Sequence, residues 1–244
     1  MKAMIFAAGL GTRLRPITDT IPKALVPVGG RPMLGRVICK LRDAGISEFV
    51  VNACHFREKI KDFLEANDFG VDVKLSMEDM EQPLETGGGI RKAAALLGTG
   101  RFLVHNVDIL SDLDVEWFLG QDDPGSLATL LLTDCEADRY LLFDDEMKLA
   151  GWTNVRTGEV KSPYPDFRPE DYRKFSFCGI HIISDAIFPL MEEWPERFSI
   201  TDFYIRSCDR HKIRGVVAKG LEIIDIGSPE KLAEAERKFA SESI

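Results

Sequence analysis

The sequence predicts an α/β protein with a doubly wound sheet that carries helices on both faces. In the first half, short apolar runs typical of buried strands alternate with segments whose apolar residues recur at helical spacing. A loop rich in glycine and proline follows the first apolar run, at the place where open α/β sheets bind ligands. The 244 residues contain no long linker or repeat, so we expect a single domain over residues 1–244.

The elements of the first half alternate regularly. Residues 1–8 predict a buried strand, and residues 31–46 predict a helix whose apolar side chains share one face and which ends at Gly45. Further along, we predict strands over 48–53, 71–77, 101–110 and 126–133, and helices over 57–67 and 87–98. Alternation of this kind is typical of a parallel sheet with crossover helices.

The second half is predicted to be richer in strands. Residues 139–182 are expected to be mostly β, with a hairpin around 144–146 and a strand over 175–183. We interpret the irregular stretch 150–175, rich in proline and charge, as an insertion over the site. Short helices over 184–191 and 199–208, strands over 213–218 and 221–226, and a helix over 228–240 complete the chain. In that last helix, Ser228 is the expected N-cap and Pro229 takes the first position.

The composition limits the classes of partner. The formal net charge of −9 argues against nucleic acid and anionic membranes, which both attract basic surfaces. No apolar run is long enough for a membrane span, and the N-terminus lacks a signal-peptide pattern. The five cysteines include no CxxC pair, which favours neither a disulfide framework nor a zinc site. We therefore expect a cytoplasmic protein, and the sequence leaves open whether it is a monomer or a homo-oligomer.

The loop over residues 7–28, "AAGLGTRLRPITDTIPKALVPV", departs from two familiar phosphate-binding motifs. A dinucleotide fingerprint needs a third glycine where Leu14 stands, and it must continue into a helix that Pro16 and Pro22 forbid. A Walker A loop needs a G-K-[ST] ending, which is missing here. The remaining alternatives are a surface turn that carries cations and a different kind of anion site.

The charges in this loop favour the anion site. The first 31 residues hold one acid but five cations, namely Lys2, Arg13, Arg15, Lys23 and Arg31. Gly9 and Gly11 allow backbone N–H groups to approach an anion closely. Arg13 offers a planar fork for phosphate oxygens, and Lys23 offers a point charge behind a proline. Local positive charge in an acidic chain predicts a small anionic ligand.

Two carboxylates each follow an apolar run. Asp108 ends "FLVHNVD", and Asp225 ends "LEIID" just before Gly227. Asp108 on its own is also consistent with a capping or turn aspartate next to Ser111 and Asp112. Taken together, two such carboxylates suit one Mg²⁺ ion, which takes one or two carboxylates and completes its shell with phosphates and water.

Residues 7–34 closely resemble the N-terminal signature of the sugar-1-phosphate nucleotidyltransferases, G-x-G-[TE]-R-[LM]-x-P-[LI]-T-x-x-x-P-K-x-[LM]-[VL]-P. Residues 225–236 also resemble the closing segment of that family. The resemblance implies a Rossmann-like mixed sheet in a three-layer α/β/α arrangement, the nucleotide-diphospho-sugar transferase fold. It also implies a reaction in which an NTP and a sugar 1-phosphate give an NDP-sugar and pyrophosphate.

The resemblance assigns roles to individual residues. It implies catalytic roles for Arg13 and Lys23, and an Mg²⁺ site at Asp108 and Asp225, although Val107 replaces the glycine that usually precedes the first aspartate. The residues implied to bind the nucleotide are Ala7, Ala8, Gly9, Gly11, Thr12, Arg13, Lys23, Gln82, Glu85, Thr86 and Gly87. Asn106, Gly179 and Asp202 are the residues expected at the sugar.

The stretch "LETGGGI" points to one branch of the family. Glu85 stands where the common L-G-T motif has glycine, and this variant resembles the uridylyltransferases for N-acetylmuramic acid 1-phosphate in cell-wall recycling. Guanylyl transfer to mannose or heptose 1-phosphate remains an alternative, as does a catalytically silent nucleotide-binding regulatory module. The E-K-P tripeptide of other branches is missing. Lys161 and Lys174 are therefore either sugar-phosphate ligands or surface lysines, and Trp152 either packs or stacks on a sugar.

Overall fold

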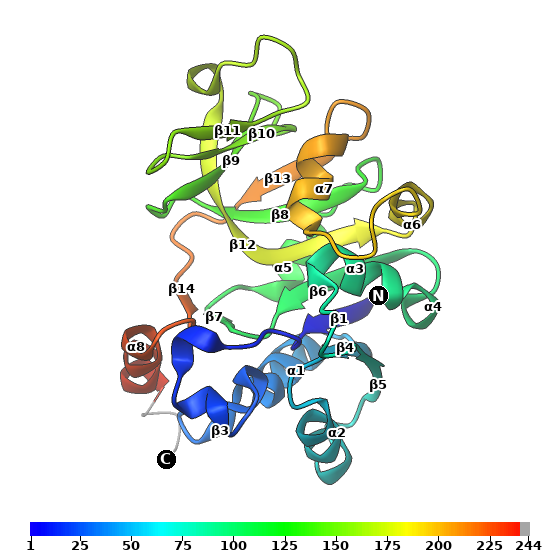
Figure 1. Cartoon of the computed structure of the whole chain (residues 1–244), viewed down its shortest axis with the longest axis vertical. Helices are drawn as coiled ribbons and strands as arrows, with labels where there is room; N and C mark the ends of the chain where they lie inside the picture. The colour runs from blue at the N-terminus through cyan, green and yellow to red at the C-terminus, as the bar shows by residue number, and fades with distance from the viewer. Residues whose placement is uncertain (240–244) are drawn as a thin grey trace.

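The first half of the chain builds the parallel part of a ten-stranded sheet (Figure 1). The computed structural model describes residues 1–239, in which the strand order is β11-β10-β9-β12-β6-β1-β4-β5, with β8 pairing to β12 and β13. The mutually parallel strands are β1 (Lys2–Phe6), β4 (Glu48–Ala53), β5 (Asp72–Met77) and β6 (Arg101–Asn106). Because these strands run in one direction, their carboxyl ends meet at one edge.

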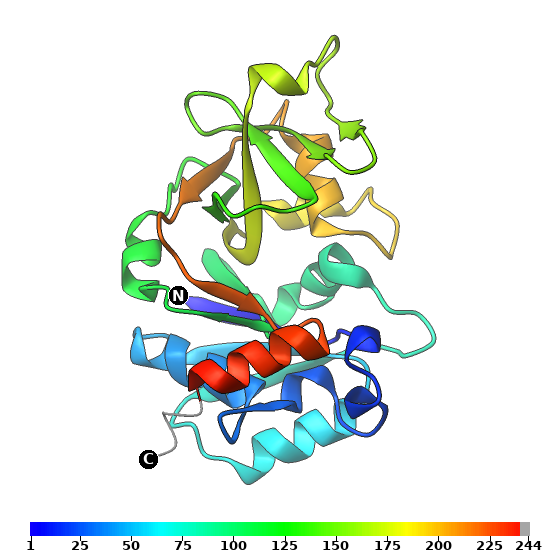
Figure 2. The ribbon, with the colours of Figure 1, turned by 90° about the vertical axis from the view of Figure 1, so that its left-hand side faces the viewer.

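Helices cover both faces of this sheet, as the sequence predicts (Figure 2). Successive residues of β1 face opposite ways, so Ala3 and Ile5 pack in one hydrophobic cluster and Met4 packs in the other. The first cluster receives α1 (Met33–Asp43), α2 (Arg57–Ala66), α5 (Val115–Gly120) and α8 (Pro229–Phe239). The second receives α3 (Glu85–Lys92), α4 (Ala94–Leu97), α6 (Ile187–Met191) and α7 (Ile200–Ser207). The three-layer α/β/α arrangement with a mixed sheet is therefore confirmed.

One long strand, β12 (Arg173–Ser184), joins the two halves of the sheet. Its beginning pairs with β9 (Arg139–Phe143), and its end pairs with β6 and with β8 (Ala128–Thr133). Between these parts Gly179 has a φ of 70°, a left-handed conformation that glycine adopts without strain. The remaining strands of this half are β10 (Leu149–Asn154), β11 (Glu159–Lys161) and β13 (Ile213–Val217).

The strand predicted over 101–110 is wrong in its extent. β6 ends at Asn106, the chain turns at Val107 and Asp108, and β7 (Ile109–Ser111) pairs with β14 (Ile223–Asp225) in a separate two-stranded sheet. The apolar run continues through the turn because Val107, Ile109 and Leu110 are all buried. Asp108 therefore lies in a turn, whereas Asp225 ends a strand as predicted.

Other differences are local. The stretch 150–175 is not simply irregular, since most of β10 and all of β11 lie in it and extend the sheet, and a 3-10 helix follows at Pro169–Asp171. The helix predicted over 87–98 begins at Glu85 and divides into α3 and α4. Short elements that the pattern did not predict are α5, the hairpin β2 (Pro27–Val28) and β3 (Arg31–Pro32), and the 3-10 turns Thr12–Leu14, Ile17–Asp19 and Lys23–Leu25.

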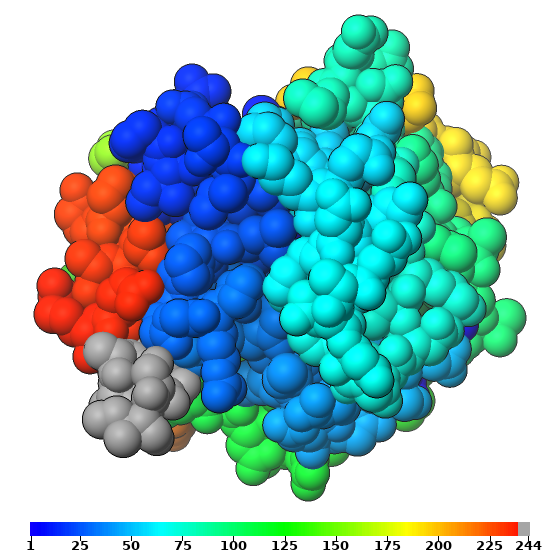
Figure 3. All heavy atoms as spheres, turned by 90° about the horizontal axis from the view of Figure 1, so that it is seen from below, coloured from blue at the N-terminus to red at the C-terminus, as the bar shows by residue number. Residues whose placement is uncertain are grey.

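The closing helix begins as predicted, because Ser228 Oγ accepts a hydrogen bond from Lys231 N. It is described to Phe239, so Ala240 of the predicted helix lies outside the described residues, and the single domain over 1–244 stays a prediction. Figure 3 shows the blue N-terminal segment between α8 in red and the cyan residues around α2. All five cysteines are free thiols. Within residues 1–239, no helix has the length and apolar character needed to cross a membrane.

Candidate active site

A cavity of about 340 Å³ opens at the carboxyl ends of the parallel strands. Its walls come from residues 6–10 after β1, Asn52 in β4, Glu78 after β5, residues 106–108 after β6, and the start of α3. This is the edge at which open α/β sheets bind ligands. The sequence-predicted residues that line the cavity are Ala7, Ala8, Gly9, Lys23, Glu85, Thr86, Asn106 and Asp108.

The loop after β1 is held in a defined shape. Gly11 has a φ of 64°, and a Cβ there would come within 2.8 Å of the Thr18 side chain and 3.2 Å of the Lys23 side chain. Thr18 Oγ1 donates a hydrogen bond to Gly11 O at 2.7 Å. Gly11 is therefore required for close packing, and this packing directs Lys23 into the cavity. Gly11 and Thr12 lie behind the cavity wall and not among its lining residues.

Lys23 connects the two predicted metal aspartates. Its side chain is buried, its Nζ forms an ion pair with Asp108, and the same atom lies 3.6 Å from Asp225 Oδ1. Burial and the neighbouring charge of Asp108 raise the pKa of Asp225, while Lys23 and Arg13 oppose this rise. The structure therefore brings together four residues that the sequence singled out, Arg13, Lys23, Asp108 and Asp225.

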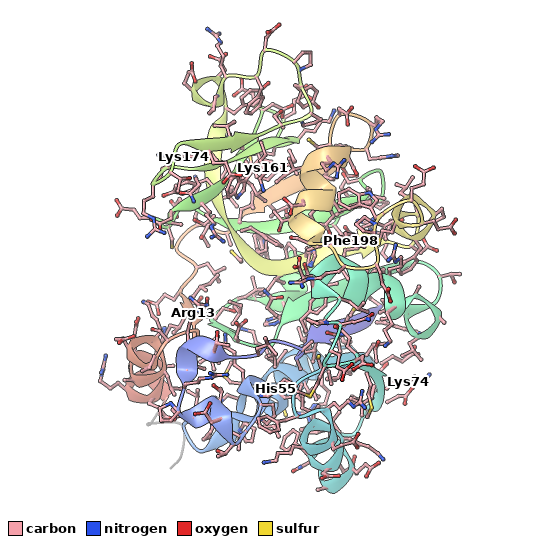
Figure 4. The ribbon with its side chains drawn as sticks, viewed as in Figure 1. Arg13, His55, Lys74, Lys161, Lys174 and Phe198 are labelled. Atoms are coloured by element: carbon pink, nitrogen blue, oxygen red, sulfur yellow. The ribbon has the colours of Figure 1, made fainter. Side chains whose placement is uncertain are left out.

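Arg13 reaches this cluster from the first 3-10 turn (Figure 4). A Cβ at Gly227 would come within 2.6 Å of Arg13 Nη2 and 2.9 Å of Asp225 Oδ1, so the guanidinium lies against this glycine. The pairing of β14 with β7 holds Asp225 next to Asp108, because Ile226 N donates to Asp108 O at 3.0 Å. Backbone pairing thus positions both carboxylates.

The two aspartates suit a magnesium ion better than a metal held by protein ligands alone. Within residues 1–239, no group of three or more His, Cys, Asp or Glu side chains could hold a metal. Mg²⁺ binds through one or two carboxylates and completes its octahedral shell with substrate phosphates and water. Asp108 and the half-exposed Asp225, which share Lys23 and have Arg13 beside Asp225, fit that requirement.

Two residues in the cavity were missed by sequence reasoning. Asn52 and Glu78 are both fully buried, and Asn52 Nδ2 donates to Glu78 Oε1 at 2.7 Å. Glu78 Oε2 accepts a hydrogen bond from Leu84 N at 2.8 Å, whereas Asn52 Oδ1 has no hydrogen-bond partner among residues 1–239. A buried unsatisfied oxygen that lines a cavity is an acceptor available to a ligand. The signal in the sequence was a polar residue near the end of an apolar strand, "EFVVNA".

Two of the predicted nucleotide-binding residues lie elsewhere. Gln82 borders a neighbouring hollow together with Arg91. Gly87 packs against the segment that precedes α7, because its N–H donates to Phe198 O at 2.9 Å and a Cβ would overlap the Phe198 ring (Figure 4). Close approach of α3 to this segment, and not an open surface, explains the glycine at position 87.

Glu85 occupies a conformation that usually belongs to glycine. Its φ is 60°, at the position where the common family motif has glycine, and such strain costs about 1–3 kcal/mol. Its Oε1 accepts a hydrogen bond from Arg197 Nε at 2.9 Å. Glu85 and Arg197 both line the cavity at the strand ends and a larger cavity beside it. The strained residue therefore marks the border between two cavities.

A second hollow, of about 420 Å³, combines aromatic rings with polar side chains, as carbohydrate sites do, and is called the carbohydrate-like hollow below. Tyr140, Trp152 and Phe177 supply rings, and Asn154, Lys161 and Asp202 supply polar groups. Lys161 Nζ donates to Asp202 Oδ1 at 3.2 Å, which holds β11 to α7. Lys174 lies outside this hollow, with its Nζ 5.1 Å from the centre of the Tyr140 ring.

Gly179 and Asn106 are in close contact. A Cβ at Gly179 would come within 2.9 Å of Asn106 Cγ, so the bend in β12 leaves exactly the room that the Asn106 side chain occupies. Asn106 lines the cavity at the strand ends, whereas Asp202 lines the carbohydrate-like hollow. The three predicted sugar residues therefore do not lie in one cavity. Asn106 and Asp202 line different cavities, and Gly179 makes room for the Asn106 side chain.

A family model described as nucleotidyl transferase matches residues 2–135. The chain belongs to this family.

Some similar proteins align with half of this chain, and others align with nearly all of it. An N-acetylmuramate alpha-1-phosphate uridylyltransferase of Neisseria meningitidis is 47% identical over 115 residues, which span 47% of this chain and 49% of that protein. A protein of the same name from Caulobacter vibrioides is 29% identical over 98% of this chain and 96% of its own length. A D-glycero-alpha-D-manno-heptose 1-phosphate guanylyltransferase of Campylobacter jejuni is 28% identical over 94% and 96%.

The crystal structure of HddC from Yersinia pseudotuberculosis superposes on this nucleotidyl transferase with a TM-score of 0.75. The two chains are 25% identical, and the match covers 98% of this chain and 99% of HddC. The whole fold, including the antiparallel half that lies beyond the family model, is therefore shared with a solved structure.

Proposed function

We propose that this protein transfers a uridylyl group from UTP to N-acetylmuramic acid 1-phosphate and releases pyrophosphate. An oxygen of the sugar phosphate attacks the α-phosphorus, and the bond from that phosphorus to the oxygen bridging to the β-phosphate breaks. The electron pair leaves with pyrophosphate. No covalent enzyme intermediate is needed, so the protein's task is to position two anions and offset their charge.

The observation that carries this proposal is the convergence of Arg13, Lys23, Asp108 and Asp225 beside the cavity at the strand ends. Arg13 and Lys23 offset charge on the α-phosphate and on the leaving pyrophosphate. Asp108 and Asp225 would hold Mg²⁺, which when bound supplies positive charge to the phosphates. Lys23, which pairs with both carboxylates, is within reach of the same region and would bind a phosphate oxygen of the substrate there.

The remaining walls support places for the base and for the sugar. In the cavity at the strand ends, the proposed nucleotide cavity, Asn52 Oδ1 is a buried acceptor with no hydrogen-bond partner among residues 1–239, suited to an N–H donor of a pyrimidine base. Asn106 stands between the nucleotide cavity and β12, where it can reach the sugar phosphate. The hollow with Trp152 and Asp202 offers a ring face and a carboxylate acceptor for sugar hydroxyls.

The names of the relatives support uridylyl transfer to N-acetylmuramic acid 1-phosphate, since two of them carry that name. A guanylyltransferase for heptose 1-phosphate is the second candidate, because such a protein aligns over 94% of this chain. A catalytically silent module has no need of both the phosphate cations and the metal acids, so the intact cluster argues against it. We also propose a cytoplasmic location, where free thiols such as these five persist.

The test is a grid of pyrophosphate-release assays with Mg²⁺. Its rows are UTP, GTP, CTP, ATP and dTTP, and its columns are the 1-phosphates of N-acetylmuramic acid, N-acetylglucosamine, glucose, mannose and heptose. We expect the highest kcat/KM for UTP with N-acetylmuramic acid 1-phosphate. The highest value for GTP with heptose 1-phosphate would replace the first candidate by the second, and no turnover with bound nucleotide would favour the silent module.

A further inference from the structure

A third cavity, of about 870 Å³, lies beside the two described above, and no function has yet been assigned to it. It shares Lys161 and Asp202 with the carbohydrate-like hollow and Glu85 and Arg197 with the nucleotide cavity. Figure 4 shows Lys161 beside α7, above Phe198, which also borders the third cavity. The third cavity is therefore continuous with both substrate sites, and a group on the bound sugar could extend into it.

This third cavity is cationic, although the protein as a whole carries a net charge of −9. Four cations line it, namely Lys161, Arg197, Arg206 and Arg210, against two carboxylates, Glu85 and Asp202. Both carboxylates are already paired: Glu85 accepts from Arg197 at 2.9 Å and Asp202 accepts from Lys161 at 3.2 Å. The surplus positive charge of the third cavity therefore lies on Arg206 and Arg210.

Arg206 is the better placed of these two arginines. The guanidinium of Arg210 lies beside Asp209, at 3.6 Å, whereas Arg206 has no carboxylate within ion-pair distance among residues 1–239. The Arg206 guanidinium stacks on the Trp194 ring, 4.9 Å from its centre. Stacking restrains the plane of the guanidinium and leaves its N–H edge available for an anion.

The helix places Arg206 next to the sugar hollow. Asp202 and Arg206 are four residues apart in α7, so they lie on one face of the helix, about 6 Å apart along its axis. A sugar that contacts Asp202 would present a substituent of a few atoms to Arg206. The planar fork of an arginine matches a carboxylate, with two parallel N–H···O bonds.

We propose that this third cavity is a subsite for a carboxylate carried by the acceptor sugar, and that Arg206 is the residue that binds it. The inference rests on the proposed function for the sugar itself. N-acetylmuramic acid differs from N-acetylglucosamine by a lactyl ether that ends in a carboxylate. The subsite thus selects the acidic sugar over its neutral counterpart, and Lys161, Arg197 and Arg210 favour the negative charge without direct contact.

The test compares two sugar phosphates in the wild type and in two variants. The ratio of kcat/KM for N-acetylmuramic acid 1-phosphate to that for N-acetylglucosamine 1-phosphate is measured with UTP in the wild type, Arg206→Gln and Arg206→Lys. Loss of a charge-assisted bidentate contact predicts a ratio about 10- to 100-fold lower in Arg206→Gln, with the change in KM and not in kcat. Arg206→Lys keeps the charge without the fork and should recover part of the ratio.

Arg168→Gln is the matched control. Arg168 is an exposed arginine of the same half of the protein, paired with Asp171 at 2.6 Å and outside all three cavities. Its replacement should keep the wild-type ratio. An equal loss for both sugars in Arg206→Gln, or an unchanged ratio, would overturn the subsite while the transferase reaction itself stands.

Binding calorimetry separates failure of the subsite from failure of the proposed function. UDP-N-acetylmuramic acid and UDP-N-acetylglucosamine are titrated into the wild type and Arg206→Gln without turnover. A preference for the acidic nucleotide sugar that disappears in the variant supports the subsite even if the grid shows another reaction. Equal affinities in the wild type would overturn the subsite even if both sugar phosphates are turned over.

Discussion

Lys23 Nζ lies 3.6 Å from Asp225 Oδ1, although the two residues come from opposite ends of the chain. The same ammonium pairs with Asp108 in the turn after β6. This contact joins the glycine-rich loop, the end of the central strand and the short strand β14 into one cluster. The pairing of β14 with β7, outside the main sheet, brings Asp225 beside Asp108. This cluster and two other features of the protein can be tested.

Lys23→Ala should lower kcat for pyrophosphate release by about 10²- to 10³-fold, because a charge that stabilises the transition state is lost. Lys61→Ala is the matched control, since Lys61 makes an exposed pair with Glu65 in α2, at 3.8 Å. The control should keep full activity. Near-wild-type turnover in Lys23→Ala would show that this lysine has no role in the chemistry.

Asp225→Asn should also lower turnover by about 10²- to 10³-fold. The midpoint of thermal unfolding at pH 7 should stay the same or rise. Partial burial and the charge of Asp108 raise the pKa of Asp225, so ionisation of this half-exposed side chain does not stabilise the folded state. Turnover is measured against Mg²⁺ concentration, and scanning calorimetry measures the midpoint. EDTA should stop the wild-type reaction, and activity that persists in EDTA would exclude the proposed ion.

Gly179→Ala should raise KM for the sugar phosphate, because the new Cβ displaces the Asn106 side chain. Gly220→Ala separates this effect from backbone strain. Gly220 has a φ of 71°, almost the same as the 70° of Gly179, but within the described part of the chain no atom beyond its own neighbours lies within 4 Å of an added Cβ. Both variants should lose about 1 kcal/mol of stability or more from the positive φ. Only Gly179→Ala should change KM, and equal kinetics in the two variants would separate Asn106 from sugar binding.

Acid should destabilise the fold through two buried histidines. Burial lowers the pKa of His105 to about 4 and that of His181 to about 3, from an ordinary value of 6.5. As the pH falls below 6.5, the unfolded chain takes up protons that the folded chain refuses, so stability is lost toward pH 4 and pH 3. At pH 5 each histidine should cost about 2 kcal/mol relative to neutral pH.

Urea unfolding of the wild type and His181→Phe at pH 7.5 and pH 5.0 measures this cost. The variant loses the contact between His181 Nδ1 and the Tyr204 hydroxyl, 2.8 Å apart, so its stability falls at both pH values. The difference between the two pH values should nevertheless be smaller by about 2 kcal/mol than in the wild type. An unchanged difference would mean that His181 titrates alike in the folded and unfolded chains.

The sequence by itself determined the features that depend on local pattern. Apolar periodicity predicted the alternating strands and helices, because burial of one face acts on residues close together in the chain. The glycines, prolines and cations of residues 7–28 predicted an anion-binding loop, since backbone freedom and charge belong to the residues themselves. Isolated aspartates after apolar runs were recognisable for the same reason.

Only the tertiary structure decided how these parts meet. The turn at Asp108 was hidden because buried residues on both sides continue the apolar run. The hydrogen bond between Asn52 and Glu78, the fit of Asn106 against Gly179, and the strands within 150–175 depend on sheet pairings between distant segments. Such pairings are set by the register of a whole sheet, and that register is a collective property that no single stretch of sequence contains.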